Sequence, residues 1–129
     1  MAYLIVFLGA GIGGAARHGV NQLAAHLFGV AFPFGTLSVN VAGSFVMGVL
    51  AEYFALRSGF SQEMRLFLTT GILGGFTTFS TFSLDAISLW ERGEWGNAAA
   101  YVVISLVLSL AGLLAGLAII RFLAQGQAA

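Results

Sequence analysis

An apolar stretch without a charged residue runs from Leu66 to Leu84, and it limits what this chain can fold into more than any other feature. A helix needs about 20 mostly apolar residues to cross a bilayer, so the stretch is long enough to span one. It is also rich in glycine, which weakens helices, and in hydroxyl and phenylalanine side chains. Irregular backbone is tolerated at membrane depth only where protein or a cavity shields it. The stretch therefore predicts a working part of the protein inside the membrane.

Composition places the whole chain in the membrane class. Of its 129 residues, 59% are hydrophobic and 8% are charged, whereas about a quarter of a soluble domain is charged. The absence of cysteine excludes disulfide and thiolate chemistry. A net charge of zero argues against a nucleic-acid partner. We find no nucleophile–base pair and no metal-ligand set, so we do not expect an enzyme.

Four apolar segments, joined by short connections, are long enough to cross a bilayer. We therefore expect an all-α integral membrane protein, with residues 1–129 forming one domain of four transmembrane helices. The helices are expected at about residues 3–27, 35–56, 64–89 and 96–123.

The arginines give little information on orientation. Four crossings place both termini and the second connection on one side, together with Arg57, Arg65 and Arg121. The other side carries Arg17 and Arg92. Because this positive-inside bias is weak, either orientation can insert. A chain that inserts both ways can form an antiparallel dimer.

The third segment contains Gly74-Gly75 followed by Thr77-Thr78. This order has poor helix propensity, and the hydroxyls offer the backbone alternative partners. If the helix opens there, its free carbonyls suit a hard cation. The alternative is that the glycines only allow close helix packing. Spacing alone leaves both interpretations open.

Phe79 and Phe82 are three residues apart, so they share one face of a helical turn. Their rings carry a positive edge, which favours an anion without binding it tightly. Ser80, Thr81 and Ser83 lie between and beside them. The alternative is ordinary packing or lipid contact, but the interleaved hydroxyls weaken it.

Asn40 lies midway along the second segment, in a stripe with Thr36, Ser44 and Gly48. A buried amide in hydrocarbon is costly unless it is paired, and polar groups there are often functional. Its amide offers two uncharged N–H donors. The alternative is an interhelical hydrogen bond that only stabilises the bundle.

Tyr101, Ser105 and Ser109 repeat the four-residue spacing on the fourth segment, so their hydroxyls align on one face. Such a row of neutral donors suits a passage for an anion. Alternatively, the serines bond back to their own helix. Arg17 on the first segment either extends its guanidinium to the interface or attracts anions to a vestibule.

Together these residues resemble the CrcB/Fluc family of fluoride channels, over essentially the whole chain. The resemblance rests on Gly13-Gly14-Ala15-Ala16-Arg17, on Pro33-Phe34-Gly35-Thr36 leading to Asn40-Val41-Ala42-Gly43-Ser44, and on Gly74-Gly75-Phe76-Thr77-Thr78-Phe79-Ser80-Thr81-Phe82. It implies an antiparallel, dual-topology homodimer with two pores in the inner (plasma) membrane. It also implies passive export of cytoplasmic fluoride, which gives fluoride resistance.

The resemblance further implies roles for single residues. Backbone carbonyls of Gly74 and Thr77 from both subunits would hold a structural sodium ion that is not transported, at a break in the third helix. Arg17 matches the vestibule arginine of the family, and Asp85 departs from the glutamate that many members carry. The residues expected along the fluoride path are Asn40, Phe79, Ser80, Thr81, Phe82, Tyr101, Ser105 and Ser109.

Two other functions remain as alternatives. A small, proton-coupled exporter of drugs or guanidinium also forms four-helix dimers, but it needs a carboxylate deep in the membrane. Glu52 and Asp85 lie close to the ends of their segments instead. A structural subunit of a larger complex would not require aligned hydroxyls on three segments.

Overall fold

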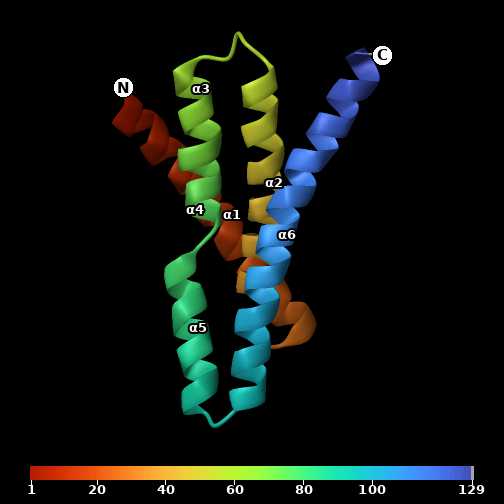
Figure 1. Ribbon diagram of the computed structural model, residues 1–129. Helices are drawn as coiled ribbons and strands as arrows, with labels where there is room; N and C mark the ends of the chain where they lie inside the picture. Colours follow the sequence, from red (N-terminus) through yellow and green to blue (C-terminus); the bar gives the residue numbers. More distant parts are fainter. Residues whose placement is uncertain (129) are drawn as a thin grey trace.

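The computed structural model describes residues 1–128, which form helices and short connections without a strand. Figure 1 shows the helices in chain order, with both termini and the α2–α3 connection at one end of the bundle. The elements are α1 (Ala2–Phe28), α2 (Phe34–Leu56), α3 (Gln62–Leu66), the π-helix η1 (Phe67–Leu73), α4 (Gly74–Phe76), α5 (Phe79–Glu91) and α6 (Trp95–Ala128).

Four spans in the described residues are long and apolar enough to cross a membrane, which confirms the predicted multi-pass helical class. The third span, Gln62–Glu91, contains α3, η1, α4 and α5. The fourth helix is longer than the segment predicted from hydropathy, because α6 continues to Ala128.

The third span contains two extended residues, Thr77 (φ −89°, ψ 160°) and Thr78 (φ −155°, ψ 123°). The sequence predicted an opening at Gly74-Gly75, but Gly74 is helical, with φ −61° and ψ −37°. The hydroxyls explain the shift. Thr77 Oγ1 donates to the Leu73 carbonyl at 2.9 Å, and Thr78 Oγ1 accepts from the Thr81 N–H at 3.2 Å. The Thr77 hydroxyl therefore bonds back to the last turn before α5, at the end of α4, and the Thr78 hydroxyl caps the start of α5.

α1 packs backbone to backbone against η1 and α4. A Cβ atom on Gly13 would collide with the Ile72 carbonyl, and one on Gly75 would collide with the Ala10 carbonyl. Such close approach requires glycine and is a common way for helices to associate in membranes. This packing keeps the glycine-rich turn helical and holds the π-helix against α1.

α2 and α6 make the second close pair. A Cβ atom on Gly48 would collide with the Leu113 carbonyl, and one on Gly116 would collide with the Phe45 carbonyl. Glycines therefore set the distance between the two helices that lie on either side of the cavity described below.

The α5–α6 turn holds the α1–α2 connection in place. Arg92 donates to the Ala31 carbonyl at 2.9 Å and forms an ion pair with Glu94 at 2.7 Å. This guanidinium, and then the Asn97 amide, lower the pKa of the Glu94 carboxyl. Nearby, Phe32 packs edge-on against Tyr101, with ring centroids 5.5 Å apart.

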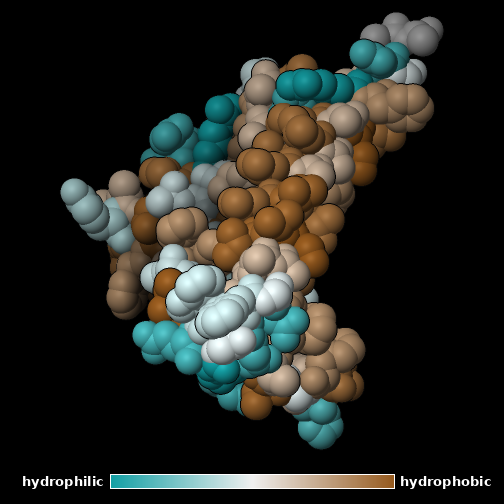
Figure 2. Space-filling view, turned by 60° about the horizontal axis from the view of Figure 1, so that its bottom comes forward, coloured by the Kyte–Doolittle hydropathy of each residue, from teal (hydrophilic) through white to brown (hydrophobic). Residues whose placement is uncertain are grey.

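Large hydrophobic side chains cover much of the outside of the bundle. Figure 2 shows them along the middle of the molecule, with hydrophilic residues gathered toward its ends. On α6, the exposed set includes Val103, Leu106, Leu110 and Leu114. A surface with this much exposed apolar area requires lipid or another apolar partner.

Candidate functional site

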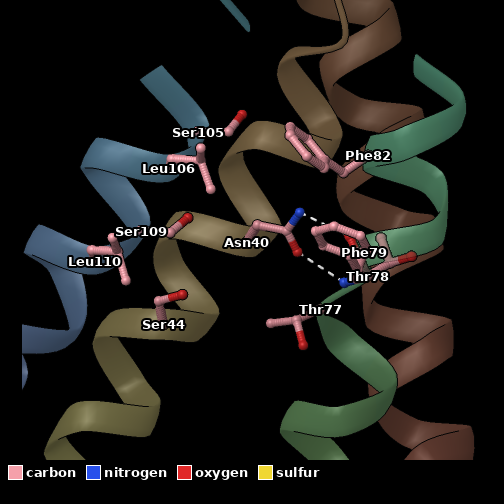
Figure 3. A pocket seen from close by; sticks show the side chains of 10 residues that line it. All are labelled: Asn40, Ser44, Thr77, Thr78, Phe79, Phe82, Ser105, Leu106, Ser109 and Leu110. Carbon is pink, nitrogen blue, oxygen red and sulfur yellow. Dashed lines mark hydrogen bonds between the residues drawn. The ribbon is translucent and has the colours of Figure 1, made fainter. Parts of the chain in front are cut away.

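A cavity of about 260 Å³ lies between α2, the Thr77–Phe82 segment and α6. Figure 3 shows side chains from these three elements around it. The ten residues that line the cavity carry no formal charge, and they are Asn40, Ser44, Thr77, Thr78, Phe79, Phe82, Ser105, Leu106, Ser109 and Leu110.

The Asn40 side chain is paired with the backbone of Thr78. Asn40 Nδ2 donates to the Thr78 carbonyl at 2.9 Å, and Asn40 Oδ1 accepts from the Thr78 N–H at 2.8 Å (Figure 3). An extended residue between two helices has no ladder partners for these groups, and unpaired groups are costly in a membrane. The amide supplies both partners and keeps one N–H hydrogen for a ligand.

Ser105 is buried, with 5% of its surface exposed, and it lines the cavity. Its Oγ atom has no hydrogen-bond partner in the described part of the chain. The alternative that Ser105 bonds back to its own helix is therefore wrong for this residue. Ser109 lies one turn further along α6 and lines the same cavity. A buried hydroxyl without a partner is costly, so this Oγ atom at the wall of the cavity stands out among the lining residues.

Phe79 and Phe82 lie at one wall of the cavity, with ring centroids 5.6 Å apart and planes at 49°. Phe79 is 76% exposed, whereas Phe82 is partly buried and packs on Tyr101 with centroids 5.2 Å apart. Phe82 is therefore packed between two rings of the chain, Phe79 and Tyr101. Phe79 is free to contact a second molecule or lipid.

Tyr101 lies outside this cavity. Its side chain is fully buried, and its hydroxyl donates to Asp85 at 3.1 Å. Asp85 lines a separate cavity of about 250 Å³ that also includes Asn21, Thr36 and Thr81. Two of the predicted path residues thus lie beside Asp85 and not at the first cavity. Thr81 lines the cavity that includes Asp85, and Tyr101 donates to Asp85.

Two more predicted site residues lie apart from both cavities. Ser80 is exposed on α5, with Oγ 3.4 Å from Thr78 Oγ1. Arg17 is half-buried on α1. The five path residues that the structure brings together around the first cavity are Asn40, Phe79, Phe82, Ser105 and Ser109.

The carbonyls of Gly74 and Thr77 have lost the donors that a continuous helix would provide. The N–H of Thr78, four residues after Gly74, donates to Asn40, and the N–H of Thr81, four residues after Thr77, donates to Thr78 Oγ1. Neutral carbonyl oxygens of this kind are ligands that suit a hard cation. Two such carbonyls are oxygen donors of the type that sodium binds, and they make up only part of an oxygen shell.

Sequence reasoning missed the pairing of Asn40 with Thr78 and the bond between Tyr101 and Asp85. Two features of the sequence bear on the pairing of Asn40 with Thr78. One is the amide of Asn40 midway along the second apolar segment, and the other is the low helix propensity around Gly74-Gly75 in the third. Nothing in the sequence showed that the two would meet.

The chain matches the family model described as CrcB-like protein, Camphor Resistance (CrcB), over residues 4–117. The "Fluoride-specific ion channel FluC" of Rhodopseudomonas palustris (strain BisB5) is 58% identical over 121 residues, covering 94% of this chain and 98% of that protein. The protein of the same name from Methylobacterium nodulans is 60% identical over 118 residues, covering 92% and 94%. That from Granulibacter bethesdensis is 56% identical over 126 residues, covering 98% and 99%. These matches confirm the resemblance, and the relatives' names are those of channels and not of enzymes.

Proposed function

The chain belongs to the CrcB family, and from that premise we propose that it is a fluoride-selective ion channel. The relatives named fluoride-specific ion channels match it along nearly their whole length. The observation that carries the proposal is the uncharged cavity, at whose wall Ser105 Oγ is buried with no partner among residues 1–128. A donor of this kind needs an acceptor, and an anion supplies one.

Neutral donors suit fluoride for a physical reason. Fluoride is small and strongly hydrated, so an entirely apolar pore would exclude it. The free N–H of Asn40, the hydroxyls of Ser105 and Ser109, and the positive ring edges of Phe79 and Phe82 replace part of its water. Conduction also requires that the ion leaves, and fixed cations would hold it too tightly.

The channel is expected to act in the plasma membrane and to export cytoplasmic fluoride passively, down its electrochemical gradient. Expression in a fluoride-sensitive bacterial strain tests this role. Growth in fluoride is expected to recover with the wild-type chain and not with Ser105→Ala. Growth that stays fluoride-sensitive although the wild-type chain is in the membrane would contradict export.

We further propose a structural sodium ion at the centre of an antiparallel homodimer. Gly74 and Thr77 of one chain offer two carbonyls, so a second copy is needed to complete an oxygen shell. Bound sodium would stabilise the carbonyls that α4 and Thr77 leave without donors. Replacing sodium with a large organic cation is expected to lower the thermal stability of the dimer, and equal stability in both salts would refute the site.

Insertion in both orientations is the remaining part of this proposal. The difference between the two ends is one arginine, so both orientations are expected in similar amounts. Labelling of a cysteine added at each terminus, from either face of intact cells, measures the ratio. A single orientation in all molecules would exclude the antiparallel dimer.

A further inference from the structure

A small pocket lies where the C-terminal ends of α2 and α6 meet, and it shares no lining residue with the candidate ion site. Its volume is about 110 Å³, and we call it the α2–α6 end pocket. Its lining residues are Tyr53, Leu56, Arg57, Ile120, Leu123, Ala124 and Gln127.

No carboxylate among the described residues pairs with the positive charge of this pocket. Arg57 Nη2 donates to Oε1 of Gln127 at 2.9 Å, which is a neutral partner, and its guanidinium lies 5.8 Å from the centroid of the Tyr53 ring. Within residues 1–128, the ion pairs are Arg92–Glu94 and Arg121–Glu52, so Arg57 is in neither. The guanidinium is thus held in place by two uncharged groups while its charge stays available.

Apolar side chains also line this pocket, which lies at the expected depth of the lipid headgroups. Leu56 and Leu123 are 49% and 54% exposed. The fourth span covers 33 residues, or about 50 Å of helix. A hydrocarbon core is about 30 Å thick, so the end of α6 extends into the headgroup region.

We propose that the α2–α6 end pocket binds an anionic phospholipid. Arg57 contacts the phosphate, and the upper part of an acyl chain lies against Leu56 and Leu123. A guanidinium with a free edge suits phosphate geometry, and a cationic headgroup such as choline would be repelled by Arg57. The site therefore prefers phosphatidylglycerol to phosphatidylcholine. This inference requires only that the chain spans a membrane, and it is independent of the ion that the protein transports.

Native mass spectrometry of the purified protein tests the proposal. The protein is mixed with equal amounts of phosphatidylglycerol and phosphatidylcholine in detergent, and the lipid retained on each protein molecule is counted. Wild type is expected to retain mainly phosphatidylglycerol. An arginine near a membrane surface contributes about 1 kcal/mol to anionic lipid binding, so Arg57→Gln is expected to lower the preference about fivefold.

Arg92→Gln is the matched control, because Arg92 lies at the other end of the bundle and is paired with Glu94. It is expected to keep the wild-type preference. Arg57→Lys retains the charge and is expected to keep most of it. Equal retention of the two lipids by wild type, or an unchanged preference in a folded Arg57→Gln, would overturn the proposal. So would loss of the lipid upon addition of millimolar inorganic phosphate, which would indicate a site for the free ion.

Discussion

Asn40 on α2 and Thr78 between α4 and α5 are joined by two hydrogen bonds, at 2.9 and 2.8 Å, that satisfy both backbone groups of Thr78. The Asn40 amide supplies one donor and one acceptor to Thr78, as the backbone of a neighbouring β-strand would. Because the same side chain lines the cavity, the position of the extended residues and the chemistry of the cavity depend on one residue.

Replacement of Asn40 by leucine should therefore damage both stability and flux. The substitution leaves the N–H and the carbonyl of Thr78 unpaired, and each such group costs about 1–3 kcal/mol. We expect a drop of several degrees in the thermal unfolding midpoint and loss of fluoride efflux. Asn40→Asp still accepts from the Thr78 N–H but repels an anion, so it should lose flux with a smaller loss of stability. Wild-type flux in Asn40→Asp would remove this amide from the ion path.

Ser105→Ala should separate function from stability. The Ser105 hydroxyl has no partner among the described residues, so its removal breaks no hydrogen bond within the chain. We expect an unfolding midpoint equal to or above that of wild type. A hydrogen bond to a charged group contributes about 1.5–3 kcal/mol, so fluoride flux should fall about tenfold or more. Unchanged flux, measured with a fluoride electrode on proteoliposomes, would show that fluoride does not use this donor.

Gly13→Ala tests the contact between α1 and the π-helix. The added methyl group would collide with the Ile72 carbonyl, and overpacking of this kind costs about 1–3 kcal/mol. We expect lower thermal stability and reduced flux, because α1 supports the segment that leads to Thr78. Gly14→Ala is the control, since a Cβ atom there meets nothing within 4 Å. Equal effects of the two substitutions would contradict the packing described here.

The two phenylalanines should respond differently to isoleucine. Phe82 packs on Tyr101, and an aromatic pair contributes about 0.5–1.5 kcal/mol beyond its buried area. Phe82→Ile is therefore expected to lower both stability and flux. Phe79 is largely exposed in the single chain, so Phe79→Ile should lower flux with little effect on the folding of the monomer. Wild-type flux in both variants would exclude the ring edges from the mechanism.

Hydropathy alone predicted the helical membrane class, because a chain with so few charges can only bury its surface in lipid. The place of the extended residues was harder to predict. Glycine propensity pointed to Gly74-Gly75, but close packing against Ala10 of α1 keeps that turn helical. The threonine hydroxyls, by bonding to Leu73 and Thr81, move the extended residues to Thr77 and Thr78. Propensity is a local quantity, and here tertiary contacts outweigh it.

The candidate site was predictable as a set of residue types and less so as an arrangement. The four-residue spacing placed Tyr101, Ser105 and Ser109 on one face of α6. That spacing does not show which neighbour each hydroxyl meets. The Tyr101 side chain is long enough to reach Asp85 on α5, so its hydroxyl does not line the first cavity. The shorter side chains of Ser105 and Ser109 do line it. Side-chain length and the rotation of neighbouring helices made this difference.

The most direct test of the central claim is the ratio of fluoride to chloride efflux from liposomes that contain the purified protein. Both ions are loaded together, and their release is followed with ion-selective electrodes. A potassium ionophore is added at the start, so that the membrane potential built up by anion efflux does not stop the release. The uncharged cavity with its free donors predicts rapid fluoride release and chloride release no faster than from protein-free liposomes. Equal release of the two ions, or no release of fluoride, would contradict the account.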